Sequence, residues 1–215
     1  MNLTIENLQK IIQDSENLKS KLPTEIAQKV GMSSQKIRHL LNNLCALDNI
    51  KYLNIGLCGG STFWSAIYNN NVKATGIDSW QDQNREDIVH NFWRNLSEVM
   101  NKETQIVNRE IHIYMQDCFT VELKDKYNIY MYDAGHTEND QYRAITYFDK
   151  YLEDEFLLIV DDWDDIYVKK GTMRGLEEMK YNIKFIWEGK GVFGDWRADS
   201  NHFWNGLLVA LISKK

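Results

Sequence analysis

Residues 52–62 read Tyr52-Leu53-Asn54-Ile55-Gly56-Leu57-Cys58-Gly59-Gly60-Ser61-Thr62, a short apolar run followed by a glycine-rich turn and a helix start. Glycine permits backbone conformations with positive φ and lets a ligand approach the main chain closely. The first N–H groups of a helix are unpaired. The stretch therefore predicts a ligand-binding loop from Asn54 to Gly60, although glycines between a strand and a helix can also be plain turn residues.

Two familiar loop types do not match this stretch. A phosphate-binding P-loop ends in Gly-Lys-Ser/Thr, and no lysine follows Gly60. The dinucleotide fingerprint is Gly-x-Gly-x-x-Gly, whereas this loop has Gly-x-x-Gly-Gly. Both kinds of nucleotide site are therefore excluded.

Short apolar runs alternate with helical patterns from Lys51 onward. The predicted strands are 51–55, 73–78, 111–116, 127–132, 156–160, 183–187 and 206–213, and the predicted helices between them are 61–69, 84–103, 137–151 and 172–180. Such alternation indicates βαβ units, and no helical period separates the last two strands. We predict an α/β fold, a Rossmann-like seven-stranded mostly parallel sheet with an antiparallel C-terminal strand pair, plus N-terminal helices.

Residues 1–50 are predicted to form a helical extension before a domain at 51–215. Pro23 is expected in the first turn of a short helix that ends at Gly31, with Ser33 capping the next helix. This resembles a helix-turn-helix that would expose Lys36, Arg38 and His39 to DNA. Six Lys/Arg against five Asp/Glu make residues 1–50 nearly neutral, so helices that cover the ligand site or form a dimer contact are the competing interpretation.

Composition limits the function classes. The net charge of −6 argues against general binding to nucleic-acid phosphates. The sequence has no run of about 18 apolar residues, so no membrane span is predicted. The first residues lack the pattern of a signal peptide. The three cysteines, Cys45, Cys58 and Cys118, match no zinc or disulfide spacing, which predicts a reducing compartment, the cytoplasm.

Acidic residues follow the second and third predicted strands. Asp78, which precedes Ser79 and Trp80, can accept two hydrogen bonds from a ribose diol, or it can cap a turn. Asp117, followed by Cys118 and Phe119, could accept a hydrogen bond from an adenine amino group beside an aromatic ring.

The ordered set of Gly56, Gly59 and Gly60, then Asp78, then Asp117 resembles the cofactor site of class I S-adenosylmethionine-dependent methyltransferases. The wording of residues 54–62 and 76–78 is similar to the small macrocin-type sugar O-methyltransferases. The resemblance implies a methyltransferase that binds S-adenosylmethionine through Asn54, Gly56, Gly59, Gly60, Ser61, Asp78, Ser79, Trp80, Asp117, Cys118, Phe119 and Asp133. Those enzymes usually carry an acid at the position of Asn54, where it contacts the methionine end of the cofactor; asparagine is uncharged.

A second acidic group follows the fourth and fifth strands. Asp133 ends one strand, and Asp161 and Asp162 end the next, so their carboxylates should converge. Crowded carboxylates favour a divalent ion such as Mg²⁺, although Asp161 and Asp162 could simply cap a turn. Metal-dependent O-methyltransferases carry similar acids, which implies a metal site at Asp133, Asp161 and Asp162. Consecutive strand residues point to opposite faces, so both can bind one ion only if the chain turns between them.

His136 follows Asp133 by three positions and is the predicted catalytic base, and Asp133 is the other predicted catalytic residue. It could also be an ordinary hydrogen-bonding loop residue, or the base of a metal-independent methyltransferase. The loop from Gly191 to Gly206 mixes aromatic and polar residues, which suits a sugar or a subunit interface. The predicted reaction is O-methylation of a small hydroxylated acceptor; the non-enzyme alternative is a DNA-binding regulator.

Overall fold

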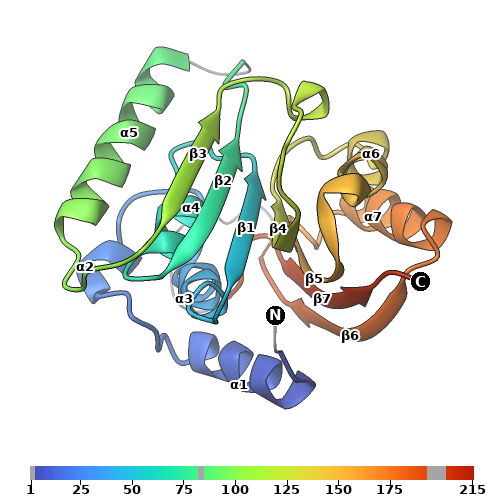
Figure 1. Ribbon diagram of the computed structural model, residues 1–215, viewed down its shortest axis with the longest axis horizontal. Helices are drawn as coiled ribbons and strands as arrows, with labels where there is room; N and C mark the ends of the chain where they lie inside the picture. Colours follow the sequence, from blue (N-terminus) through green and yellow to red (C-terminus); the bar gives the residue numbers. More distant parts are fainter. Residues whose placement is uncertain (1–2, 82–84, 193–201) are drawn as a thin grey trace.

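The computed structural model describes residues 3–81, 85–192 and 202–215. Within these residues seven strands form one sheet in the order β3-β2-β1-β4-β5-β7-β6 (Figure 1). The strands are β1 Ile50–Ile55, β2 Val72–Ile77, β3 Glu110–Tyr114, β4 Tyr127–Tyr132, β5 Leu152–Asp161, β6 Asn182–Gly189 and β7 Leu207–Ser213. Pairs among β1 to β5 are parallel, whereas β7 is antiparallel to both β5 and β6. The predicted fold class is confirmed.

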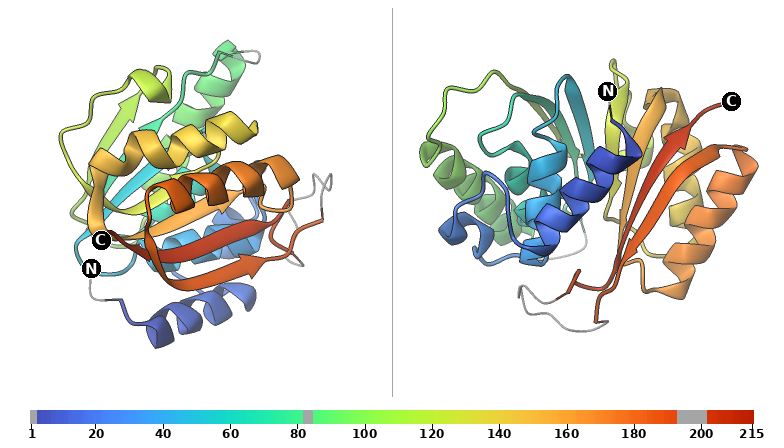
Figure 2. Two further views of the ribbon diagram at one scale, coloured as in Figure 1. Left: turned by 90° about the vertical axis from the view of Figure 1, so that its right-hand side faces the viewer. Right: turned by 90° about the horizontal axis from the view of Figure 1, so that it is seen from below.

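Helices cover both faces of the sheet (Figure 2). They are α1 Ile5–Glu16, α2 Thr24–Ala27, α3 Gln35–Leu44, α4 Ser61–Ile67, α5 Arg85–Asn101, α6 Glu138–Phe148 and α7 Ile166–Glu178, with short 3₁₀ turns at Cys118–Thr120 and Asp149–Tyr151. Tyr52 packs in the core shared with α1, α3, α4 and α5, while its neighbour Leu53 packs in the core shared with α6 and α7. This alternation is the period of two that a strand imposes. None of the described helices could span a membrane.

Helix α7 begins at Ile166, not at residue 172 as predicted. Asp165 caps it by accepting a hydrogen bond from the Tyr167 amide at 2.7 Å. Gly171 weakens the helical pattern in the sequence. In the structure a Cβ at Gly171 would lie 2.2 Å from the Glu138 carbonyl oxygen, so this glycine permits close packing of α7 on α6.

The N-terminal helices bury two of the three predicted DNA-reading residues, Arg38 and His39, and leave Lys36 half-buried. Helix α2 ends at Ala27 rather than Gly31, and Ser34, not Ser33, is the N-cap of α3. Pro23 is the residue just before α2. Arg38 is fully buried and His39 is only 3% exposed, because α3 packs tightly between α1 and α4. The predicted exposure of Arg38 and His39 is therefore wrong, and neither side chain is available to read a base.

Candidate functional site

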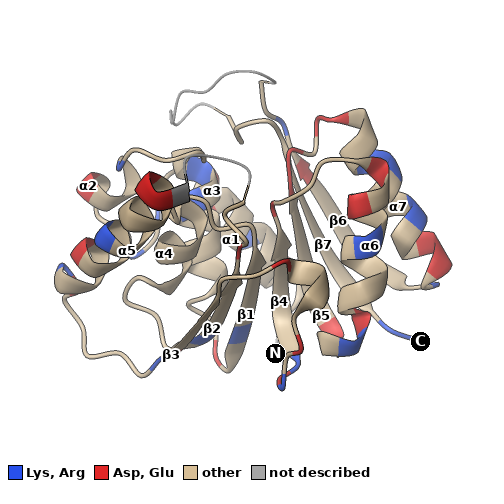
Figure 3. Ribbon diagram, turned by 90° about the horizontal axis from the view of Figure 1, so that it is seen from above, with Lys and Arg blue, Asp and Glu red and all other residues tan. Residues whose placement is uncertain are grey.

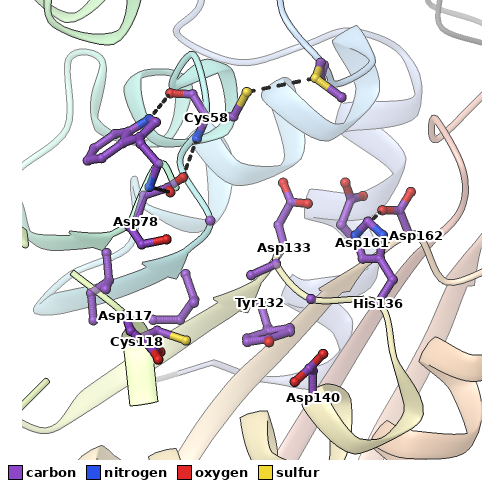
Figure 4. A pocket seen from close by; sticks show the side chains of 18 of the residues that line it. Cys58, Asp78, Asp117, Cys118, Tyr132, Asp133, His136, Asp140, Asp161 and Asp162 are labelled. Carbon is purple, nitrogen blue, oxygen red and sulfur yellow. Dashed lines mark hydrogen bonds and ion pairs between the residues drawn. The ribbon is translucent and has the colours of Figure 1, made fainter. Parts of the chain in front are cut away.

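A cavity of about 720 Å³ opens where β1, β2, β4 and β5 end. The strand order reverses between β1 and β4, and ligands of open α/β sheets bind at such a switch point. Figure 4 shows Asp78 and Asp117 on one side of the cavity and Asp133, His136, Asp161 and Asp162 on the other. The sequence placed these acids at strand ends, and the parallel sheet brings them together.

The glycine loop is shaped by contact with the neighbouring strand. Gly56 has φ +83°, and a Cβ there would lie 1.7 Å from the carbonyl oxygen of Asp133. Any larger residue would push β1 away from the end of β4. The loop then reaches Gly60, the N-cap of α4. Gly56 and Cys58 line the cavity.

Asp78 holds this loop in place. Its Oδ2 accepts hydrogen bonds from the Leu57 and Cys58 amides, both at 2.8 Å, and its Oδ1 accepts one from the Trp80 amide at 2.7 Å. The Trp80 indole N–H in turn donates to the Cys58 carbonyl at 3.0 Å. Asp78, Ser79 and Trp80, the residues predicted to contact the cofactor, all line the cavity. The Asp78 carboxylate therefore both orders the glycine loop and faces the cavity.

Asn54 does not line the cavity, contrary to the predicted cofactor contact. It is fully buried, its Oδ1 accepts from the Tyr52 hydroxyl at 2.9 Å, and its Nδ2 donates to the Gly56 carbonyl at 3.0 Å. Its amide is used to brace the loop from behind. Gly59, Gly60 and Ser61 also lie outside the lining.

Asp117, Cys118 and Phe119, which were predicted to lie beside an adenine ring, line the cavity. Asp117 caps the short turn there, because its Oδ1 accepts from the Phe119 amide at 2.9 Å. Arg143 of α6 also lines the cavity, with its guanidinium 3.8 Å from the centre of the Phe119 ring. The sequence analysis missed Arg143, although it lies one helical turn beyond Asp140 in the helix that follows β4.

The acidic side is organised by a reversal of the chain after β5. Asp162 has φ +54°, so it turns away from the strand direction of Asp161. Its Oδ2 lies 2.9 Å from His136 Nε2, and its Oδ1 accepts from the Asn205 amide at 2.7 Å. Figure 3 shows the acidic segments (red) between the end of β5 and the start of α7.

The pKa values of the carboxyl groups on this side are shifted in different directions. Burial, followed by the charges of Asp161 and Asp162, raises the pKa of Asp133 well above its usual value. Burial and the charge of Asp162 likewise raise the pKa of Asp161. Burial opposes ionisation of Asp162 too, but hydrogen bonds from His136 and Asn205 outweigh it and lower the pKa of Asp162. The hydrogen bond to Asp162 raises the pKa of His136.

Three groups of this side could hold one metal ion. One ligand atom each from Asp133, His136 and Asp162 lies within 4.8 Å of the other two. The predicted set had Asp161 in place of His136; Asp161 is 4% exposed, and its Oδ1 has no hydrogen-bond partner among the described residues. The turn between Asp161 and Asp162 that a shared metal ion would require does occur, but it places Asp162 beside the imidazole of His136, which stands in place of Asp161 in the cluster.

The loop from Gly191 to Gly206 is described only in part. Residues 193–201 of the predicted segment lie outside the described residues. Trp204 and Asn205, at the end of that segment, line the cavity, and Phe203 packs against Trp187 at 4.9 Å between ring centres. The N-terminal extension adds Met32 to the lining, which the sequence did not indicate.

No family model and no curated protein sequence matches the chain. Among solved structures it is similar to the N-methyltransferase NodS from Bradyrhizobium japonicum in complex with S-adenosyl-L-homocysteine, with TM-score 0.57, 12% identity and coverage of 95% of this chain and 98% of that chain. It is also similar to an O-methyltransferase from Bacillus cereus in complex with the same compound, with TM-score 0.51, 12% identity and coverage of 99% and 93%. A third is the ribosomal protein L11 methylase from Lactobacillus delbrueckii subsp. bulgaricus, with TM-score 0.54, 10% identity and coverage of 85% and 78%.

These likenesses give the chain the fold of the S-adenosylmethionine-dependent methyltransferases. The three proteins are named for methyl transfer to different kinds of acceptor. Fold alone therefore does not select an acceptor, and the macrocin-type resemblance stays a prediction.

Proposed function

We propose that the chain is an S-adenosylmethionine-dependent methyltransferase that methylates an oxygen of a small hydroxylated acceptor such as a sugar, with help from a divalent ion. The observation that carries the proposal is the cavity at the switch point, which joins the Asp78-braced glycine loop to the acidic side. Asp78 and Asp117 lie where the ribose and adenine of the cofactor would be bound. The acceptor would enter from the side of His136 and Asn205.

The acidic side fits a divalent ion. Two carboxylates and one imidazole converge, and a buried carboxylate oxygen of Asp161 is unpartnered among the described residues. Burial, followed by the charges of the neighbouring acids, raises the pKa of Asp133 and so penalises its ionisation. A hard cation such as Mg²⁺ with room for water would relieve that penalty. Asp133, His136 and Asp162 would hold the ion.

When bound, S-adenosylmethionine supplies an activated methyl group and the divalent ion supplies charge that acidifies an acceptor hydroxyl. The residues of the chain then have a positioning task. Asp133, His136 and Asp162, which the turn at Asp162 brings together, would position the acceptor oxygen in line with the methyl group, as the transfer requires. The buried walls of β1 and β4 exclude water from one side.

The cofactor proposal is tested by a thermal shift with S-adenosylhomocysteine, using NAD⁺ and ATP as controls. At a large excess over its dissociation constant the ligand should raise the Tm by about 5 °C or more. The controls should have no effect, because the loop lacks their motifs. Equal shifts with all three compounds, or none with S-adenosylhomocysteine, would contradict the proposal.

The acceptor and the metal are tested together. A panel of glycans and phenols is incubated with methyl-labelled S-adenosylmethionine, with EDTA and with EDTA plus excess Mg²⁺. We expect EDTA to abolish labelling and Mg²⁺ to restore it. Amine-bearing analogues of the same compounds are included in the panel, and labelling that appears only on those amines would contradict the O-methylation proposal.

One observation favours a second candidate, a metal-independent methyltransferase with His136 as base. The 2.9 Å pair of His136 with Asp162 would orient the imidazole and increase its basicity, as in acid–base dyads. In that case His136→Ala abolishes turnover while EDTA leaves the wild type unchanged. In the metal-assisted case EDTA and the substitution act on the same site, and both abolish turnover.

A further inference from the structure

The segment Lys29–Ser33 lies between α2 and α3 and reaches the cavity through Met32. Met32 is 48% exposed and lines the cavity, and its Sδ is contacted by Cys58 Sγ at 3.9 Å, the contact drawn from Cys58 in Figure 4. Cys58 belongs to the glycine loop. A residue of the N-terminal extension therefore lines the cavity beside that loop.

Arg38 fixes this segment from below. Its Nη1 donates to the carbonyls of Ala27 at 2.9 Å and Lys29 at 2.5 Å, and its Nη2 donates to the Gly31 carbonyl at 3.2 Å. Its Nε donates to Ser33 Oγ at 2.9 Å. One side chain thus ties down successive turns of the segment, including carbonyls left unpaired at the end of α2.

The cost of this arrangement indicates its importance. Arg38 is fully buried, and within the described ranges no carboxylate forms an ion pair with it. Its guanidinium lies 5.3 Å from the Trp64 ring of α4, and burial lowers the pKa of Arg38 to about 10, so it stays charged at neutral pH. Burying a cation that is satisfied only by carbonyls, a hydroxyl and a ring carries a desolvation cost. We infer that the arrangement is kept because it holds the segment in place.

The segment is also joined directly to the start of α4. Ser33 donates from its Oγ to Ser61 Oγ at 2.9 Å, and a Cβ at Gly31 would lie 2.6 Å from the Ser61 Cβ. Ser61 was predicted from the sequence to contact the cofactor; the structure gives its hydroxyl to Ser33. The first residue of α4 is therefore the anchor of the segment.

We propose that Met32 is a cofactor-contacting residue and that Arg38 is its positioning residue. Arg38, Ser33 and Ser61 hold the segment Lys29–Ser33 as a wall of the cofactor cavity, with the Met32 thioether packed over the methionyl end of the ligand beside Cys58. This rests on the proposed function for the identity of the ligand, but the clamp itself does not.

The experiment measures S-adenosylhomocysteine affinity by calorimetry and hydrogen exchange of the Lys29–Ser33 amides without ligand. Met32→Ala should weaken binding about fivefold to tenfold through lost apolar contact, and Met32→Leu should restore it to within about twofold. Arg38→Gln should weaken binding similarly and accelerate exchange across the segment, with Arg38→Lys in between. The matched control is Arg109→Gln, which removes another buried arginine, paired with Glu103 at the opposite end of the sheet.

Arg109→Gln should lower the Tm and leave both the affinity and the exchange of the segment unchanged. Wild-type affinity in Met32→Ala overturns the contact, and unchanged exchange in Arg38→Gln overturns the clamp. If the wild type itself does not bind S-adenosylhomocysteine, the proposed function fails and the contact with it. The exchange result still decides the clamp.

Discussion

The carboxylates on the two sides of the cavity have opposite surroundings: those on one side accept backbone hydrogen bonds, and two on the other are buried beside like charges. On the side proposed to bind the cofactor, Asp78 accepts three backbone hydrogen bonds, and Asp117 accepts one from the turn it caps. On the acidic side, burial and mutual repulsion raise the pKa of Asp133 and of Asp161. The first side is already satisfied by the protein's own backbone, whereas the second lacks positive charge.

This difference indicates what each side requires from a ligand. A cofactor that enters the first side meets a loop whose shape is fixed in advance, so little ordering cost remains. The second side has His136 and Asn205 against three carboxylates, and only Asp162 is stabilised in its charged form. Removing Asp78 should therefore damage the first side, whereas removing Asp133, whose ionisation is penalised, should relieve the second.

The largest effect is expected from Asp78→Ala. It deletes three charge-assisted hydrogen bonds to the loop as well as the proposed ribose contact, so S-adenosylhomocysteine affinity should fall at least about 100-fold. Calorimetry measures this. Asp117→Ala is the matched control on the same side, with one backbone bond to lose, and should cost less than about tenfold. Equal losses in the two variants would show that Asp78 has no special role in shaping the loop.

On the acidic side, Asp162→Asn should reduce turnover about 100-fold while affinity for S-adenosylhomocysteine stays near that of the wild type. The amide cannot orient His136 as a carboxylate does, and it is a poor metal ligand. Initial rates at saturating cofactor measure the effect. Asp165→Asn is the control, because Asp165 lines the same cavity but caps α7, and asparagine also caps helices. A full rate in Asp162→Asn would remove this side from the chemistry.

Asp133→Asn should stabilise the ligand-free protein. A carboxyl whose pKa is higher in the folded state than in the unfolded state contributes stability at low pH and loses it as pH rises. Burial and the neighbouring acids raise the pKa of Asp133, so its ionisation works against folding near neutral pH. The variant should have a Tm a few degrees above the wild type at about pH 8, and the difference should shrink toward about pH 4.

Excess Mg²⁺ should reverse this order. It should raise the Tm of the wild type, because the ion binds the folded state and offsets the crowding, and leave Asp133→Asn unchanged. If Mg²⁺ leaves the Tm of the wild type unchanged while Asp133→Asn still has the higher Tm, the electrostatic explanation stands and the metal site is contradicted.

The sequence predicted the parts of the site that depend on strand ends. Apolar runs located β1, β2, β4 and β5, and a parallel sheet necessarily gathers the residues that follow them, so Asp78 and Asp133 were found. It could not predict that the atoms lying within 4.8 Å of one another belong to Asp133, Asp162 and His136 rather than Asp161, because this depends on the positive φ of Asp162.

Met32 could not be predicted either. No local pattern signals that a loop of the N-terminal helices reaches the glycine loop; this depends on how α3 packs on α4. In the sequence the basic residues Lys36 and Arg38 resembled those of a DNA-reading helix. The sequence did not reveal that Arg38 is buried, because its burial depends on tertiary packing.

Asn54→Asp is expected to have the smallest effect on binding and is the sharpest test of the resemblance. An acid at this position would be expected from the sequence to tighten the cofactor. In the structure Nδ2 of Asn54 donates to the carbonyls of Gly56 at 3.0 Å and Ile55 at 3.4 Å, so a carboxylate there would face two carbonyl oxygens. The variant should lose about 1–3 kcal/mol of stability and change S-adenosylhomocysteine affinity by no more than about twofold. Tyr52→Phe, which removes the hydroxyl donor to Asn54 without adding charge, is the control for the stability loss. Tighter binding in Asn54→Asp would mean that the side chain reaches the methionine end after all, and that the loop rearranges when the cofactor binds.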